Sequence, residues 1–267
     1  MNHSNDPLEI RPPPGFRWQP WVARWDRMQE RYLVRRNERF ATMVALIDAT
    51  QARVERVLDL GCGPGSLMLA LLEAFPKVEV YGVDYDPSMM LLARARLARF
   101  RSRAQLIRAD LRHTSWIEAL PGPVEAVVSA TALHWLEPVA LAALYRRLAG
   151  LLRPGGILLN ADHVGSEHPA VQRAWEKQRA QERTAEGYVR MGEQKADDWD
   201  AFWAAYSRAL GYELAPGQPA IDGWEEGVEE GLPLAWHLDR LRAAGFYAVD
   251  CFARWHTDAL YGGLKEG

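Results

Sequence analysis

The sequence has 267 residues, of which 48% are apolar and 25% are charged, and its formal net charge is −3 at pH 7. This composition is typical of a globular protein and excludes collagen-like, coiled-coil and wholly disordered chains. The near-neutral charge gives no global attraction to nucleic acid or to anionic lipid. The chain has no apolar stretch of about 18 residues, no signal-peptide pattern at its polar start, and only two cysteines, Cys62 and Cys251. We therefore expect a cytoplasmic protein with no membrane span.

Apolar residues of residues 21–50 recur at helical spacing, after a proline-rich segment over 1–20 that predicts a flexible arm. Short apolar runs then alternate with helical patterns as far as residue 162. Strands are predicted at 56–60, 78–84, 104–108, 124–129 and 156–162, with helices at 66–75, from 87, near 115–120 and at 138–152. Ser66 is expected to cap the first of these helices. This alternation predicts a parallel sheet with helices on both faces.

The alternation stops at residues 163–231, which contain two helical stretches and then a Gly/Pro/acidic segment. A helix at 234–244 follows, and strands at 246–255 and 258–262 are close enough to form an antiparallel hairpin. The positions where the alternation of strands and helices begins, stops and resumes divide the chain into four predicted parts. They are a flexible arm at 1–20, an N-terminal helical lid at 21–50, a cofactor-binding α/β domain at 51–162 and 232–267, and a helical substrate cap at 163–231 inserted after the fifth strand.

A glycine-rich turn joins the first strand to its helix, with the sequence Asp-Leu-Gly-Cys-Gly-Pro-Gly at residues 59–65. Glycine lets the backbone approach a ligand closely, and a helix N-terminus offers free N–H groups to an anion. The glycines are spaced GxGxG and Ser66 follows, which differs from the dinucleotide fingerprint GxGxxG and from the P-loop. We therefore expect no gain in binding from NAD or FAD.

This turn resembles the first motif of the class I S-adenosylmethionine-dependent methyltransferases that act on small molecules. Four later segments also resemble that family in the same order: 83–89 after the second strand, 109–111 after the third, 127–136 around the fourth, and 152–158 before the fifth. The resemblance implies a seven-stranded, mostly parallel sheet of order 3-2-1-4-5-7-6 with strand 7 antiparallel. It also implies S-adenosylmethionine as cofactor and S-adenosylhomocysteine as product.

The resemblance assigns cofactor contacts to residues at the ends of four strands. Asp59 and the glycine turn are expected to hold the methionyl end, Asp84 the ribose hydroxyls, and Asp110 the adenine amine. The full expected set is Asp59, Gly61, Cys62, Gly63, Gly65, Asp84, Tyr85, Met89, Asp110, Leu111, Ser129 and Ala130. A plainer alternative is that Asp84 caps the helix over 87–100 and that Asp110 caps the next turn.

Methyl transfer relies on the cofactor for activation, and the protein aligns the acceptor and excludes water. A carboxylate acceptor needs no base, whereas a hydroxyl, amine or carbon acceptor benefits from one. His134 and His163, just past strands 4 and 5, are the candidate bases, and shaping the wall is the alternative for His134. Tyr32, Trp135, Trp199 and Trp203 are the candidate substrate contacts. Ser129 occupies the position where catechol-type sites carry a metal-binding acid, so no metal is predicted.

The predicted acceptor is a small molecule, in part aromatic or apolar, because the cap is rich in aromatic residues. The cap carries 14 acidic against seven basic residues, which disfavours a nucleic-acid acceptor. Arginine-rich stretches at 24–39 and 94–112 keep a tRNA- or other RNA-directed methyltransferase as an alternative. A non-catalytic S-adenosylmethionine-binding protein is a second alternative. The sequence indicates no oligomeric state.

Overall fold

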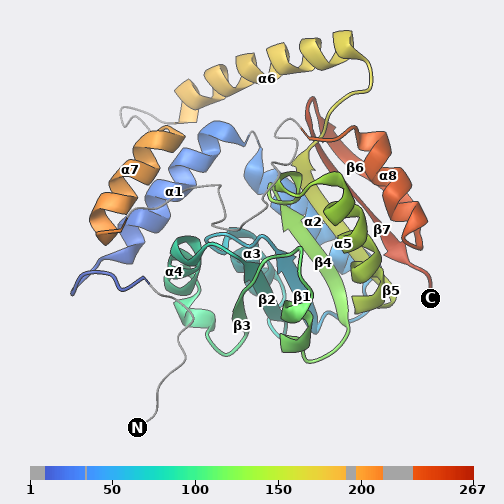
Figure 1. Cartoon of the computed structure of the whole chain (residues 1–267), viewed down its shortest axis with the longest axis horizontal. Coiled ribbons are helices and arrows are strands. Elements are labelled where there is room, and N and C mark those ends of the chain that lie inside the picture. Colours follow the sequence, from blue (N-terminus) through green and yellow to red (C-terminus); the bar gives the residue numbers. More distant parts are fainter. Residues whose placement is uncertain (1–9, 34, 191–196, 213–230) are drawn as a thin grey trace.

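A computed structural model describes residues 10–33, 35–190, 197–212 and 231–267 (Figure 1). Its centre is a seven-stranded sheet of order β3-β2-β1-β4-β5-β7-β6, as predicted. Only β7 runs antiparallel to its neighbours β5 and β6, and the other pairs are parallel. The strands are β1 Arg56–Leu60, β2 Glu79–Asp84, β3 Ala104–Arg108, β4 Val124–Ala130, β5 Leu152–His163, β6 Phe246–Trp255 and β7 Asp258–Lys265.

The described part of the chain contains eight α-helices. They are α1 Trp18–Tyr32, α2 Arg36–Thr50, α3 Ser66–Ala74, α4 Pro87–Arg96, α5 Pro138–Leu151, α6 Pro169–Arg190, α7 Trp199–Leu210 and α8 Leu234–Ala243. Of these, α1, α6 and α7 lie together away from the sheet (Figure 1). Single 3₁₀ turns occur at Ala98–Phe100, Ser115–Ala119 and Leu133–Trp135. In the residues the structure describes, none of these helices combines the length and apolar character needed to cross a bilayer.

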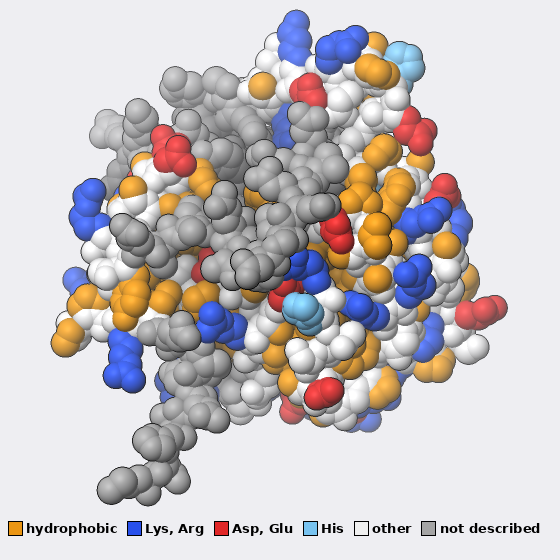
Figure 2. Space-filling model, viewed as in Figure 1, with side chains coloured by type: hydrophobic (Ala, Val, Ile, Leu, Met, Phe, Trp, Pro, Cys, Tyr) orange, Lys and Arg blue, Asp and Glu red, His pale blue; other side chains and the backbone are white. Residues whose placement is uncertain are grey.

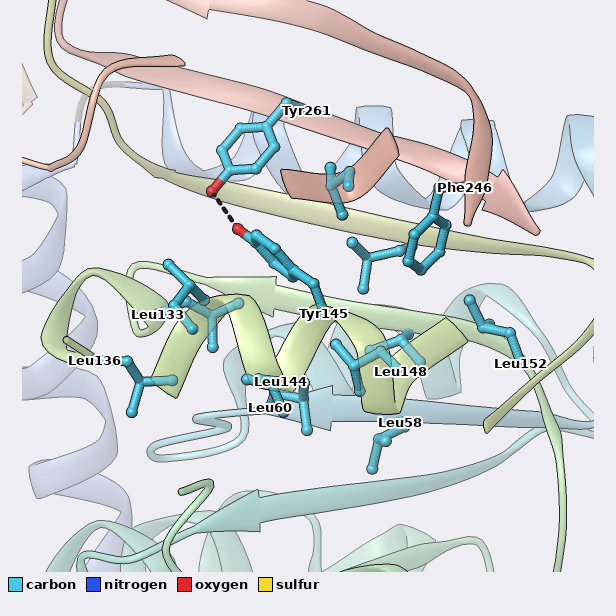
Figure 3. Close-up of a cluster of buried hydrophobic side chains, with 14 of the residues drawn as sticks. Leu58, Leu60, Leu133, Leu136, Leu144, Tyr145, Leu148, Leu152, Phe246 and Tyr261 are labelled. Carbon is cyan, nitrogen blue, oxygen red and sulfur yellow. Dashed lines mark hydrogen bonds between the residues drawn. The ribbon is translucent and has the colours of Figure 1, made fainter. Parts of the chain in front are cut away.

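Strand side chains alternate between two cores because successive residues of a strand point to opposite faces of the sheet. Leu58 and Leu60 pack with α5 and α8 on one face, and Figure 3 shows α5 lying across this core. Val57 packs with α2 and α3 on the other face. A third cluster joins α1, α4 and α7 away from the sheet. The helical segment predicted at 21–50 therefore contains two helices with different roles, since α2 packs on the sheet and α1 packs on α4, α6 and α7.

Two local predictions were wrong. Ser66 is the first residue of α3 and not its cap; the cap is Gly65, at φ +74° and with no side-chain bond to the helix. Glycine adopts this left-handed conformation without the steric cost of a side chain. The fifth strand was predicted to begin at residue 156, but β5 begins at Leu152, and its pairing with β4 shifts register between Val124 and Ala126.

Candidate active site

A cleft opens where β1, β2, β3 and β4 end, between the sheet and helices α1, α2 and α7. Ligands of open α/β sheets bind at this carboxyl edge. Ten of the twelve expected cofactor residues line the cleft, together with three of the four expected substrate residues. The ten are Asp59, Gly61, Cys62, Gly63, Asp84, Tyr85, Met89, Asp110, Leu111 and Ala130.

The glycine turn is held against β2 by its own backbone. The N–H groups of Gly61 and Cys62 donate to the carbonyl of Val83 at 2.8 and 3.1 Å. A Cβ on Gly61, at φ +64°, would lie 2.3 Å from the Cβ of Ala132, so only glycine fits there. A Cβ on Gly63, at φ +49°, would meet no atom within 4 Å. Gly63 therefore leaves an open cradle on the cleft side, where a ligand can approach the backbone.

Asp84 joins the end of β2 to the glycine turn. Its carboxylate accepts from the N–H of Gly63 at 2.7 Å and from the N–H of Asp86 at 2.9 Å. The cap of α4 is Asp86, which accepts from the N–H groups of Ser88 and Met89. The reading of Asp84 as the cap of that helix is therefore wrong. Burial raises the pKa of Asp84 to about 6, because desolvation disfavours the charged form.

Asp59 lines the cleft and is almost fully buried, with 1% of its surface exposed. Its Oδ2 atom is buried and has no hydrogen-bond partner. Burial, and then the nearby charge of Asp84, raise the pKa of Asp59 well above its usual value. An unpartnered buried carboxylate oxygen is costly unless a donor reaches it, so this atom is ready for a cationic or N–H donor of a ligand.

Asp110 lines the far end of the cleft but is already engaged by Arg112. The Arg112 side chain donates to both carboxylate oxygens, and its backbone N–H donates to Oδ1 at 2.9 Å. Partial burial would raise the pKa of Asp110, but the hydrogen bonds and charge of Arg112 lower it overall. Asp110 therefore does organise the turn that follows it, while its carboxylate still faces the cleft beside Leu111.

Two expected cofactor residues do not line the cleft. Gly65 caps α3, and an added Cβ there would lie 3.0 Å from Leu97. Ser129 is 1% exposed, and its hydroxyl donates to the carbonyl of Leu60 at 2.7 Å. Gly65 therefore stabilises the start of α3, and Ser129 stabilises the contact between β4 and β1.

Neither candidate base lines the cleft. His134 is 8% exposed and its Nδ1 lies 2.7 Å from Oδ1 of Asp162, while its backbone N–H donates to Oδ2 of the same carboxylate. His163 lies 2.5 Å from Asp258, which also accepts from Arg39 at 2.7 Å. The two imidazole rings are neighbours, with centroids 4.8 Å apart. Burial lowers the pKa of His163, although Asp258 opposes this. Their catalytic role stays a prediction.

Indole rings form the helical wall of the cleft. Trp199 and Trp203 of α7 pack against Trp25 of α1, with ring centroids 6.0 and 6.1 Å from it, and all three line the cleft together with Trp135. Other aromatic residues of α7, Phe202 and Tyr206, are fully buried in the core beneath them. The aromatic residues of the cap therefore divide between a wall and a core. The side chain of Tyr32, at the end of α1, lies outside the described part of the structure.

Five lining residues from the N-terminal helical segment were missed: Trp25, Gln29, Leu33, Arg36 and Phe40. They lie in the segment predicted to be an N-terminal helical lid, from which only Tyr32 was predicted to contact a ligand. Arg36 is only 9% exposed. The spacing of apolar residues along a helix does not predict that an arginine will be buried at a ligand cleft. The arginine-rich run at 24–39 was the feature that could have drawn attention to it.

Comparisons with known proteins agree with this geometry. A family model described as a methyltransferase domain matches residues 57–156. The trans-aconitate 2-methyltransferase of Azoarcus sp. (strain BH72) is 37% identical over 102 residues, which cover 38% of this chain and 36% of that protein. The enzyme of the same name from Pseudomonas aeruginosa is 36% identical over 137 residues, covering 51% of this chain and 46% of that protein. The chain thus spans less than half the length of these relatives.

A solved structure shares the fold over a longer part of the chain. An O-methyltransferase family protein from Burkholderia thailandensis matches with a TM-score of 0.53 at 19% identity, covering 93% of this chain and 70% of that one. The family model and the relatives both indicate a methyltransferase domain, and the sheet order is consistent with it. A methyltransferase domain therefore occupies residues 57–156, and the sheet order is the one expected from the resemblance to the class I S-adenosylmethionine-dependent methyltransferases.

Proposed function

We propose that the chain binds S-adenosylmethionine in this cleft and transfers its methyl group to a small-molecule acceptor, releasing S-adenosylhomocysteine. The observation that carries the proposal is the combination of Asp59, Gly63 and Asp84 at one edge of the sheet. They supply an unpartnered buried oxygen, an open backbone cradle and a carboxylate at the tip of β2.

Each of these groups suits a part of the cofactor. The free Oδ2 of Asp59 can accept from the methionyl ammonium. Asp84 makes two backbone hydrogen bonds, and its two oxygens have about four acceptor positions in all, so it can also accept from both ribose hydroxyls. Tyr85, Met89 and Leu111 supply apolar surface for the nucleoside, and Asp110 an acceptor for its exocyclic amine.

The bound cofactor supplies an activated sulfonium methyl, and the chain's own residues align the acceptor and exclude water. The wall formed by Trp25, Trp135, Trp199 and Trp203 supports an acceptor with an aromatic or apolar part. α1 and α7, which carry three of these rings, are the lid and cap elements in this proposal. The relatives are named for trans-aconitate, so carboxylate-bearing acceptors belong in any search.

An RNA acceptor is less well supported. On the face shown in Figure 2, basic side chains are scattered among acidic and hydrophobic ones. Several arginines are also engaged in ion pairs, such as Arg96 with Asp26 and Arg112 with Asp110. A surface that follows a nucleic-acid backbone needs a continuous basic face.

The test is methyl transfer from S-adenosylmethionine labelled in its methyl group to a panel of small carboxylic acids, phenols and amines, with bulk tRNA as a separate arm. Label in a small-molecule product is the expected result. Label only in tRNA would favour the RNA-directed alternative. Binding of S-adenosylhomocysteine without transfer to any compound of an extended metabolite pool would favour a non-catalytic role.

A further inference from the structure

We infer that Arg36, with Ser66 and the first turn of α3, forms the binding site for the carboxylate of the cofactor's amino-acid end. The inference rests on the proposed function and adds a residue from outside the glycine turn to the site. It also divides the methionyl end of the cofactor between two places of opposite charge.

Arg36 is the first residue of α2 and directly follows Arg35, which has a left-handed backbone at φ +59°. Its side chain is 10% exposed, and it lines the cleft together with Ser66 and Pro64. The guanidinium lies over the ring of Phe40, 5.0 Å from the ring centroid. A cation is thus held at the cleft, next to the turn that is expected to bind the cofactor.

The charge of Arg36 is only partly neutralised. Its protein partner among the described residues is Asp26, at 3.3 Å. Asp26 is already engaged by Arg96, whose two terminal nitrogens lie 2.9 and 3.0 Å from its oxygens. One carboxylate therefore serves two guanidinium groups. Because a guanidinium has five N–H donors in a planar fork, Arg36 retains the capacity to bind a second carboxylate in bidentate fashion.

The start of α3 supplies further donors at the same place. Its cap, Gly65, makes no side-chain bond to the helix, and its first turn contains no acidic residue. The hydroxyl oxygen of Ser66 is buried and has no hydrogen-bond partner. N–H groups at a helix start favour an anion, and the unpartnered hydroxyl adds a donor of its own.

A group of opposite sign completes the arrangement. The unpartnered Oδ2 of Asp59 lines the same cleft as Arg36 and Ser66. An α-amino acid carries one ammonium and one carboxylate on the same carbon. A buried carboxyl group that can accept from the ammonium and a buried guanidinium that can donate to the carboxylate are the two groups that such a zwitterion needs. A carboxylate on the acceptor has the same chemistry, so the experiment must separate the two sources.

The experiment is calorimetric titration of the full chain with S-adenosylhomocysteine and with its decarboxylated analogue, which lacks only the carboxylate. The variants are Arg36→Met, Arg36→Lys and the neighbouring control Arg35→Met, whose side chain is 49% exposed. We expect Arg36→Met to weaken S-adenosylhomocysteine by roughly 10–100-fold, the usual cost of losing a charge-assisted hydrogen-bonded pair. The analogue should change by less than about twofold, Arg36→Lys should lose less than Arg36→Met, and the control should match the parent chain.

Equal losses for both ligands would overturn the inference, because Arg36 would then only shape the cleft. Unchanged affinity for S-adenosylhomocysteine would also overturn it and would leave the acceptor as the source of any carboxylate. If Arg36→Met does not fold, Ser66→Ala decides the matter, with an expected loss of roughly 3–10-fold confined to S-adenosylhomocysteine. Failure of the parent chain to bind S-adenosylhomocysteine would contradict the proposed function instead.

Discussion

The two walls of the cleft differ in chemistry and in how they are built. The sheet-side wall presents Asp59, Asp84 and the glycine turn, all within a few residues of strand ends whose backbone is hydrogen-bonded in the sheet. The helix-side wall presents Trp25, Trp199 and Trp203, which reach the cleft only because α1 and α7 pack together. A rigid polar wall suits a constant ligand, and an apolar wall on packed helices suits a variable one. We therefore propose that the sheet side, together with Arg36 at the start of α2, recognises the cofactor and that the tryptophans of α1 and α7 recognise the acceptor.

The largest expected effect is on the sheet side. Asp84→Ala should weaken S-adenosylhomocysteine binding by about 1.5–3 kcal/mol, since two ribose hydroxyls and the N–H groups of Gly63 and Asp86 lose their acceptor. Calorimetry on the folded variant measures this. The control is Glu79→Ala, an exposed acid at the opposite end of β2. A folded Asp84→Ala protein with parental affinity would remove Asp84 from the site.

The raised pKa of Asp84 predicts the next effect. Ribose hydroxyls need the ionised carboxylate, so S-adenosylhomocysteine affinity should fall about tenfold for each pH unit below about 6. The stability of the unliganded protein should depend on pH in the opposite direction. Because the pKa of Asp84 is raised in the folded state, protonated Asp84 contributes to the free energy of unfolding at low pH, and this contribution is lost as the pH rises through about 6. Titrations between pH 5 and 8 test the binding effect. Asp84→Asn should reduce its slope, and an undiminished slope would assign the titration to another group.

A helix-side substitution should produce a smaller and different effect. Trp199→Ala should raise the KM of the methyl acceptor roughly tenfold, since an indole face is lost from the wall. It should leave S-adenosylhomocysteine affinity within about threefold. The control is Trp175→Ala, because Trp175 packs under Arg254 rather than in the cleft. If Trp199→Ala weakened the cofactor as much as Asp84→Ala, the division between the walls would fail.

The smallest effect expected is a change in the rate of amide hydrogen exchange in α1 and α7. Lid elements open to admit ligands and exchange faster than sheet cores. Bound S-adenosylhomocysteine should slow amide exchange several-fold in α1 and α7, and leave β1, β4 and β5 unchanged because they are already protected. Hydrogen-exchange mass spectrometry measures both regions in one sample. Indifference of α1 and α7, with a response in the glycine turn, would show that they do not close over the cofactor.

The sheet-side wall was largely predictable because its residues are neighbours in sequence. A buried strand, a glycine turn and a helix place Asp59 to Gly63 together by local geometry alone. The strand order and the antiparallel β7 were confirmed, and these bring the separate turns after β1, β2, β3 and β4 to one edge.

The helix-side wall could not be predicted in the same way. Whether Trp203 faces a ligand or a core depends on how α7 packs against α1, which lies about 180 residues earlier in the sequence. The contact of Arg36 with the cleft depends on the left-handed turn at Arg35. For the two histidines, the position in the sequence did not predict whether the side chain lines the cleft. His134 follows β4 as predicted, whereas His163 is the last residue of β5. The two imidazoles contact Asp162 and Asp258, and neither histidine lines the cleft.

The central claim is that this cleft is built for S-adenosylmethionine, and the most direct test is parallel calorimetry of the full chain with S-adenosylmethionine, NAD and FAD. The arrangement of GxGxG, Ser66 and the Asp59–Asp84 pair predicts micromolar binding of S-adenosylmethionine and no measurable binding of either dinucleotide. Binding of NAD or FAD without binding of S-adenosylmethionine would contradict the account.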